Sequence, residues 1–241
     1  MYQPRTYRHW VKGEDLISAS VTVKETDLYI SALTNLKRRA LKLVVKYREM
    51  LEGYIERYPS FLTTLTPIDV GEDAPQIVRS MGHAARLVGV GPMASVAGAI
   101  AEFVGDELLA YSAEVIVENG GDIYLKSLRE RVVGIYAGES PLSGRIGLEI
   151  SPKATPTGIC TSSGTVGHSL SYGQADAVVV LARSAALADA AATAIGNRII
   201  KADDIPLGIE FARGIEGLNG VVIIKEDNLG VWGEVKLCHT E

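Results

Sequence analysis

The order of the apolar segments is the feature that most limits what this chain can fold into. Five segments with strand-like patterns follow one another at residues 115–118, 122–126, 131–137, 145–150 and 159–162, and a sixth apolar run covers residues 178–181. Helical patterns gather in blocks before and after them. A parallel α/β sheet needs strands and helices to alternate, so this order predicts an α+β fold with a mostly antiparallel sheet and packed helices.

The N-terminal part adds a hairpin and a long amphipathic helix. Residues 17–23 and 27–31 alternate in polarity on either side of Glu25-Thr26, which predicts a hairpin with one buried face. Residues 34–58 repeat apolar side chains at three- and four-residue steps, and Pro59 ends this helix. Further helices are expected at residues 74–87, 93–110, 184–199 and after Asp203-Asp204, with a closing hairpin at residues 221–225 and 229–237.

Composition bounds the class of protein. With 241 residues, 47% of them apolar, the chain can bury a proper core, and no repeat or low-complexity linker divides residues 1–241, so one domain is expected. The net charge of −5 argues against non-specific nucleic-acid binding, which requires a cationic surface. A cluster at Lys37-Arg38-Arg39 and Lys42 is either a basic patch or the solvated face of a helix, and the second is favoured.

Membrane insertion and secretion are not expected. The longest apolar stretch, residues 177–182, is far too short to cross a bilayer, so no membrane partner is predicted. The N-terminus lacks the apolar core of a signal peptide, and Cys160 and Cys238 are too few for a disulfide-stapled scaffold. We therefore expect a cytoplasmic protein.

Asp189 and Thr193 are candidate metal ligands. They lie four residues apart in a predicted helix, so their side chains share one face about a turn apart. A carboxylate and a hydroxyl form an incomplete Mg²⁺ shell, which water, a carbonyl or a ligand phosphate would complete. The alternative is a solvent-facing Asp and a Thr bonded back to its own helix.

Two glycine-containing segments are candidate ligand-binding loops. Asn119-Gly120-Gly121-Asp122 joins two strand-like runs and is a hairpin turn that could also bring Gly120, Gly121 and Asp122 to a ligand. Thr161, Ser162, Ser163 and Gly164 offer hydroxyls and amides that suit phosphate oxygens, and His168 follows as a candidate proton donor. A polar surface loop explains the second segment equally well.

Cys160 immediately precedes this second loop. In an electropositive, amide-rich setting its thiolate would be favoured, and it could act as a nucleophile or carry sulfur. A lone Cys at the end of a strand is more often a small core residue. The sequence leaves both roles open.

In their order along the chain, these segments resemble the ApbE-like superfamily, whose best-known members are Mg²⁺-dependent FAD:protein FMN transferases. The Gly120-Gly121-Asp122 turn is similar to the family's Gly-Gly-Asp turn, residues 159–164 to its Thr-Ser-Gly loop, and His168 to the His that follows. Ala188-Asp189 through Thr193-Ala194 matches its Ala-Asp-x-x-x-Thr-Ala signature. The resemblance implies a T-fold-like architecture, with Asp189 and Thr193 as metal ligands.

Two departures separate the chain from the flavin transferases. Residues 93–98 lack the Lys of the family's Gly-Ile-Ala-Lys-Gly stretch, and Ser169 and the residues after it lack the Asp-Pro that follows the family's His. Both departures resemble the uncharacterised prokaryotic branch of the superfamily. The fold inference survives them, whereas FMN transfer does not follow.

We therefore expect an ApbE-like protein that binds a small phosphate-bearing ligand, a flavin or another nucleotide, together with a divalent metal such as Mg²⁺. The expected enzyme class is a Mg²⁺-dependent transferase related to the FMN transferases. One alternative is thiol or sulfur transfer by Cys160, and another is a non-catalytic scaffold that keeps the fold. The Ala- and Gly-rich residues 93–110 would suit close packing between subunits, so a homodimer is also expected.

Overall fold

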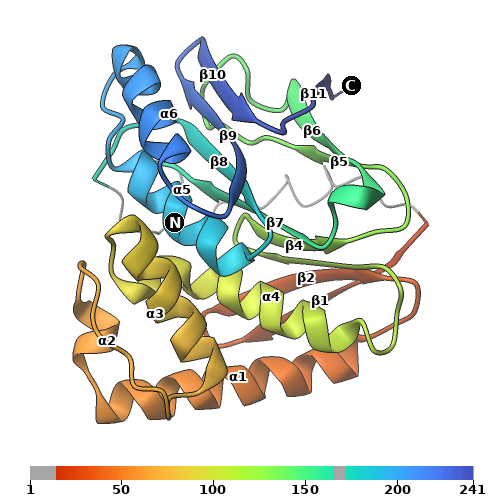
Figure 1. Ribbon diagram of the computed structural model, residues 1–241. Helices are drawn as coiled ribbons and strands as arrows, with labels where there is room; N and C mark the ends of the chain where they lie inside the picture. Colours follow the sequence, from red (N-terminus) through yellow and green to blue (C-terminus); the bar gives the residue numbers. More distant parts are fainter. Residues whose placement is uncertain (1–14, 166–171, 241) are drawn as a thin grey trace.

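The computed structural model describes residues 15–165 and 172–240. Its main element is an eight-stranded sheet, ordered β1-β2-β3-β4-β7-β8-β9-β10, and a second sheet has the order β11-β6-β5 (Figure 1). Every pair of neighbouring strands in both sheets is antiparallel, as expected from the sequence. The large sheet consists of β1 (Ile17–Val23), β2 (Thr26–Ala32), β3 (Val115–Asn119), β4 (Asp122–Lys126), β7 (Thr157–Ser162), β8 (Ala177–Ala182), β9 (Leu218–Lys225) and β10 (Asn228–Gly233).

The helices and the small sheet lie on opposite faces of the large sheet. The small sheet consists of β5 (Arg131–Gly134), β6 (Ile146–Ile150) and β11 (Leu237–His239). The α-helices are α1 (Lys37–Arg57), α2 (Ser60–Thr63), α3 (Gln76–Val88), α4 (Val96–Leu108), α5 (Ala185–Gly196) and α6 (Ile205–Arg213). The α+β fold with a mostly antiparallel sheet and packed helices is thus confirmed.

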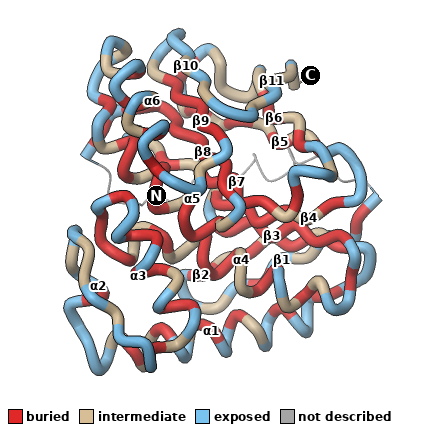
Figure 2. The backbone as a smooth tube through the Cα atoms, viewed as in Figure 1, coloured by how far each residue is buried: buried red, intermediate tan, exposed pale blue. Residues whose placement is uncertain are grey.

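Alternation along the strands supplies two apolar cores. On β8, Val178 and Val180 belong to the core beneath the helices, whereas Val179 and Leu181 belong to the core beneath the small sheet. Successive strand residues point to opposite faces, so one strand serves both cores. Figure 2 shows the resulting buried band through the middle of the molecule. Strands buried on both faces read as continuous apolar runs, which is the pattern seen at residues 177–182.

Small residues bring α5 close to its neighbours. A Cβ added to Gly158 on β7 would lie 2.3 Å from Ala185 Cα, and one added to Gly98 on α4 would lie 2.3 Å from Ala185 O. Contacts of that length are not tolerated, so only glycine at both positions allows this packing. Ser184 caps the helix as expected, because its Oγ accepts a hydrogen bond from the Leu187 amide at 3.3 Å.

The expected elements are present, with differences at their ends. The N-terminal hairpin is present, but its turn is Lys24-Glu25, because Thr26 already belongs to β2 and pairs with Val23. The expected helix at residues 93–110 is shorter, because residues Pro92–Ser95 form a 3₁₀ turn and α4 begins at Val96. Among the described residues no single helix is long and apolar enough to span a membrane; α3 and residues Pro92–Leu108 meet that criterion only jointly, across a 105° bend.

The expected closing hairpin is wrong in its second half. The strand predicted at residues 229–237 ends at Gly233, whose φ of 89° turns the chain out of the large sheet. After this turn β11 pairs with β6, and Leu237 lies opposite Leu148. A left-handed glycine inside an otherwise strand-like pattern therefore moves the C-terminal residues from one sheet to the other.

Candidate functional site

A tight turn brings Asp122 to the helix-covered face of the sheet. Asn119 pairs with Asp122 across the β3–β4 hairpin, and Gly120 and Gly121 have φ values of 70° and 107°. Glycine adopts this backbone conformation at little cost, which explains both residues as turn formers. Because Tyr124 two residues later belongs to the helix-side core, Asp122 points to the same side. Its side chain is buried there, with 7% exposure.

Helix α5 brings Asp189 to the same place from the other side. Asp189 Oδ2 accepts a hydrogen bond of 2.9 Å from the Gly98 amide in the first turn of α4. A Cβ at Gly98 would lie 2.9 Å from Asp189 Cβ, so the missing side chain makes this contact possible. Asp189 is therefore not the solvent-facing residue of the alternative interpretation. Thr193 lies one turn further along α5 and is partly exposed.

The two carboxyl groups interact unfavourably when both are ionised. Burial raises the pKa of Asp122 well above its usual range, and the neighbouring Asp189 carboxylate raises it further. Burial likewise raises the pKa of Asp189 to about 7, although hydrogen bonds from the backbone at Gly98 and Ala97 lower it in part. A cation between such groups would offset their repulsion.

The Oδ1 atom of Asp122 stands out within this pair. It is the one buried side-chain nitrogen or oxygen that lacks a hydrogen-bond partner in the part of the chain that the structure describes. Leaving a buried polar atom unpaired is costly, so such an atom calls for an explanation. A bound cation or a ligand group that donates a hydrogen bond would satisfy it.

Cys160 lies beside these carboxyl groups on the neighbouring strand, β7. Its side chain is fully buried, and Sγ lies 3.3 Å from the carbonyl oxygen of Ala185. Burial raises the pKa of the Cys160 thiol, and the Asp122 and Asp189 carboxylates raise it further. A nucleophilic thiolate needs access and an electropositive setting, and Cys160 has neither, which counts against thiol chemistry.

The Thr161–Gly164 segment divides between the two faces of the sheet. Ser162 shares the helix-covered face with Cys160, whereas Thr161 lies on the opposite face with Ile159. Ser162 is buried, and Ser163 and Gly164 leave the strand at its end. Gly164 packs so closely that a Cβ there would lie 2.0 Å from Gly173 O. His168 lies outside the described residues.

Sequence reasoning missed the residues that connect the turn to α4. Asn119 Nδ2 donates a hydrogen bond of 3.1 Å to Ala97 O, and Gly98 binds Asp189 as described. On the opposite face of the sheet, Glu118 Oε1 accepts a 2.8 Å hydrogen bond from the Gly121 amide and so stabilises the turn. The Ala- and Gly-rich composition near residue 97 indicated close packing, but it did not show that α5 would be the neighbour.

The donor set fits a hard divalent cation. Asp122 and Asp189 contribute carboxylate oxygens from two different elements, and Asp122 Oδ1 has no other partner. The described residues hold no group of three or more His, Cys, Asp or Glu side chains able to bind a metal ion. Mg²⁺ is commonly bound by one or two carboxylates, with phosphate oxygens and water completing its shell. The chemistry of the pair is consistent with that mode of binding.

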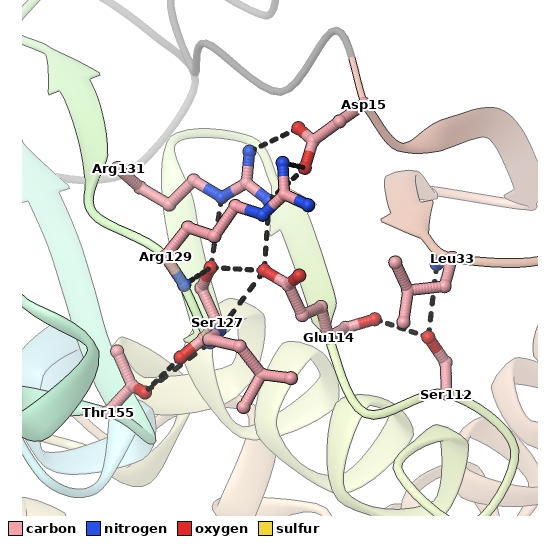
Figure 3. A network of polar contacts seen from close by, with 9 residues as sticks. Asp15, Leu33, Ser112, Glu114, Ser127, Arg129, Arg131 and Thr155 are labelled. Atoms are coloured by element: carbon pink, nitrogen blue, oxygen red, sulfur yellow. Dashed lines mark hydrogen bonds and ion pairs between the residues drawn. The ribbon is translucent and has the colours of Figure 1, made fainter.

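A second buried charged cluster lies away from this site and is fully paired (Figure 3). Arg131 on β5, 4% exposed, binds both oxygens of Asp15 at 2.6 and 3.0 Å and Glu114 Oε2 at 2.9 Å. Glu114 Oε2 also accepts hydrogen bonds from Ser127 Oγ and, at 3.1 Å, from the Leu128 amide. We assign this cluster to structure, since it ties β5 to the segments flanking β3 and β4.

Comparison with known families and curated proteins gives consistent matches. The family model described as "AbpE bacteria" matches residues 8–208. A UPF0280 protein from Methanococcus aeolicus is 43% identical over 230 residues, covering 93% of this chain and 90% of that protein. A UPF0280 protein from Methanocaldococcus jannaschii is 42% identical over 221 residues, covering 89% of this chain and 90% of that protein.

Solved structures show the same fold at much lower sequence identity. The flavin transferase ApbE from Vibrio cholerae aligns with a TM-score of 0.57 and 13% identity, covering 90% of this chain and 96% of that chain. The ApbE protein from Thermotoga maritima aligns with a TM-score of 0.59 and 12% identity, covering 91% and 97%. Identities this low establish the shared architecture and leave the chemistry to be argued from the site.

Proposed function

The chain belongs to the AbpE bacteria family of ApbE-like proteins, and from this membership and the pairing of buried Asp122 with partly exposed Asp189 we propose that it binds a nucleotide-type phosphate ligand together with a divalent cation. The ligand class is a flavin or another nucleotide, and the reaction class is a Mg²⁺-dependent transfer related to that of flavin transferases. The observation that carries the proposal is the unpaired Asp122 Oδ1 beside Asp189.

Each residue has a distinct role in this proposal. Asp189 and Thr193 hold the cation from α5, and Asp122 faces it from β4. No atom of the described residues lies within 4 Å of where a Cβ would stand at Gly120 or Gly121, which leaves room for a ligand at the turn backbone. Ser162 and Ser163 lie at the end of β7, level with the β3–β4 turn, and supply hydroxyls for phosphate oxygens, whereas the Gly164 amide donates a hydrogen bond of 2.9 Å to Ala175 O.

The bound cation would supply charge neutralisation to the phosphates and to the leaving group. The protein's own contribution is to keep two carboxylates close together in a largely water-excluded setting, where their attraction for a cation is strengthened. Hydrogen bonds from Gly98 to Asp189 and from Asn119 to Ala97 keep α4, α5 and the β3–β4 turn in fixed relation.

Thermal unfolding with Mg²⁺ and nucleotide tests the proposal. We expect FAD, FMN or ATP to raise the Tm by about 5–10 °C when Mg²⁺ is present and the ligand is at about a hundredfold excess over its dissociation constant. Asp122→Asn and Asp189→Asn should remove this rise while the protein remains folded. Asp69→Asn, which changes a fully exposed carboxylate, is the matched control and should behave as wild type.

Two results would count against the proposal. If none of these nucleotides stabilises the wild type in a Mg²⁺-dependent way, the ligand class is wrong. If Asp122→Asn and Asp189→Asn retain the full Mg²⁺-dependent rise, a ligand binds but these carboxylates do not hold the cation.

A further inference from the structure

Helix α1 is the outermost helix of the molecule. Ala40, Val44, Tyr47, Leu51 and Tyr54 turn towards the core, where the helix packs on β1 and α4. Since β1 is the last strand of the large sheet, no described strand lies beyond it. Figure 1 shows α1 along the margin of the molecule, at the end of the sheet opposite β10. Its outer face is therefore a surface rather than an interior contact.

A single stripe of exposed residues runs along this outer face. Its members recur at three- and four-residue steps, the spacing of one helix face. They are Arg38, Leu41, Lys42, Val45, Glu49 and Glu56. Leu41 and Val45 are 45% and 37% exposed, so the stripe has an apolar centre with charged residues at both ends.

The charges of the stripe are separated by sign and have no partner in the described part of the monomer. Arg38 and Lys42 lie in the N-terminal half, and Glu49 and Glu56 in the C-terminal half. No described residue forms an ion pair or hydrogen bond with these four side chains, whereas Lys46 on the same helix binds Glu107. A helix dipole favours acidic residues at its N-terminus and basic ones at its C-terminus, so this arrangement is unfavourable for an isolated helix.

Gly53 is a second unexplained feature of the same face. Glycine in a helix interior weakens the helix relative to alanine. A Cβ added at Gly53 would meet no described atom within 4 Å, so no contact with the described part of the chain requires glycine there. Close approach by something outside the chain would account for it.

We propose that α1 is a homodimer interface, in which its outer face packs antiparallel against that of α1 in a second copy, about a two-fold axis that crosses the helix at the level of residue 47. The helix spans residues 37–57, so an axis at its midpoint brings Arg38 opposite Glu56 of the second copy. The same register brings Leu41 over Gly53 of the second copy. Lys42 lies at the level of Glu52 of the second copy, so the half of each helix that carries Arg38 and Lys42 faces the half that carries Glu52 and Glu56, and the antiparallel helix dipoles attract one another.

This interface differs from the one expected from the sequence. The Ala- and Gly-rich helix α4 does not present its small residues to a second subunit, because Gly98 packs on α5 and Gly105 on Tyr124 inside the molecule. The α1 stripe is separate from the Asp122 and Asp189 site, so the two proposals stand or fall independently.

Charge reversal tests the interface in the full-length protein. Light scattering after size exclusion, over a roughly hundredfold concentration series, should show a wild-type dimer. Arg38→Glu and Glu56→Arg should each weaken the dimer by at least about tenfold, because like charges then face one another across the two-fold axis. An equimolar mixture of the two variants should restore a heterodimer, since each altered residue meets an opposite charge.

Glu216→Arg, an exposed reversal away from the stripe, is the matched control and should dimerise as wild type. Far-UV circular dichroism shows whether each variant stays folded. A wild type that remains monomeric throughout would overturn the proposal. A dimer that tolerates both reversals, or a mixture that fails to restore it, would overturn the α1 register.

Discussion

Two clusters of buried and partly buried charge in this protein differ in how their carboxylates are compensated. At the small sheet, Glu114 and Asp15 both face Arg131, which donates hydrogen bonds to the two carboxylates (Figure 3). Beneath α5, Asp122 and Asp189 face one another, no described cationic side chain forms an ion pair with either, and Asp122 Oδ1 has no hydrogen-bond partner among the described residues. A carboxylate thus stabilises the folded state in the Arg131 cluster and destabilises it in the Asp122–Asp189 cluster.

The contrast distinguishes charge that the fold itself compensates from charge that the proposed ligand would compensate. A buried carboxylate that is fully paired serves the fold, whereas one held beside another carboxylate persists only because the surrounding structure imposes it. The glycines at positions 98, 120 and 121 supply that constraint through close packing and positive φ. Strongly perturbed groups of this kind cluster at functional sites.

Removing the Arg131 guanidinium, the positive charge of the paired cluster, should have the largest effect on stability. Arg131→Met leaves Glu114 buried without its counter-charge, so we expect a loss of about 3–5 kcal/mol in the free energy of unfolding, measured by urea denaturation. Adding Glu114→Leu should recover part of this loss. Lys201→Met, which disrupts an exposed ion pair with Asp203, is the control and should change stability by less than about 1 kcal/mol. An Arg131→Met variant as stable as this control would contradict the assignment.

Replacing a carboxylate of the Asp122–Asp189 cluster should instead increase the free energy of unfolding. Asp122→Asn keeps the shape of the side chain and removes a carboxyl group whose ionisation is disfavoured by burial and by Asp189. We expect a gain of about 1–2 kcal/mol without metal, together with loss of the Mg²⁺-dependent shift. Urea denaturation with and without Mg²⁺ measures both effects. A destabilised variant would mean that the Asp122 charge is already compensated.

The pH dependence of stability should also have opposite signs in the two clusters. The pKa of Asp189 is raised from 3.8 to about 7, so between these values the folded state binds more protons, and raising the pH destabilises the metal-free protein. The pKa of Glu114 is lowered from 4.5, so its contribution is present above that value and is lost as the pH falls. Each proton contributes at most about 1.4 kcal/mol per pH unit.

Urea denaturation between about pH 4 and pH 8 measures these slopes. Asp189→Asn should flatten the decline toward neutral pH and leave the acid limb unchanged. A wild type whose stability rises steadily up to pH 7 would show that Asp189 is ionised throughout that range.

The smallest effect concerns the reactivity of Cys160, whose thiol we expect to be alkylated slowly. Cys238 is partly exposed and should react first with a thiol reagent, while buried Cys160 should react only when the protein unfolds. Peptide mapping by mass spectrometry after timed alkylation distinguishes the two sites. Rapid labelling of Cys160 would show that the carboxyl pair lies in an open pocket and would revive thiol chemistry.

Local sequence patterns predicted much of the fold. Alternation at residues 17–23 gave the first hairpin, the Ser184 cap gave the start of α5, and paired glycines gave the β3–β4 turn, because each depends on neighbouring residues. The path of β11 was missed, since strand pattern alone does not show which sheet a strand joins.

The site was only partly predictable for a similar reason. Spacing along α5 related Asp189 to Thr193, and the resemblance added Asp122, but the Gly98 contact depends on residues 91 positions apart in the chain. The pairing of Arg131 with Asp15 spans 116 positions. Both required the folded arrangement, in which separate segments meet.

The close contacts around Ala185 constrain how this protein can vary. Gly98 and Gly158 meet the first turn of α5 through backbone atoms, so positions 98, 158 and 185 cannot enlarge independently. The spacing between Asp189 and Asp122 is thereby set by the main chain, which random core substitutions leave untouched. We therefore expect that related sequences with a different ligand preference differ in the surrounding loops and keep both Asp122 and Asp189.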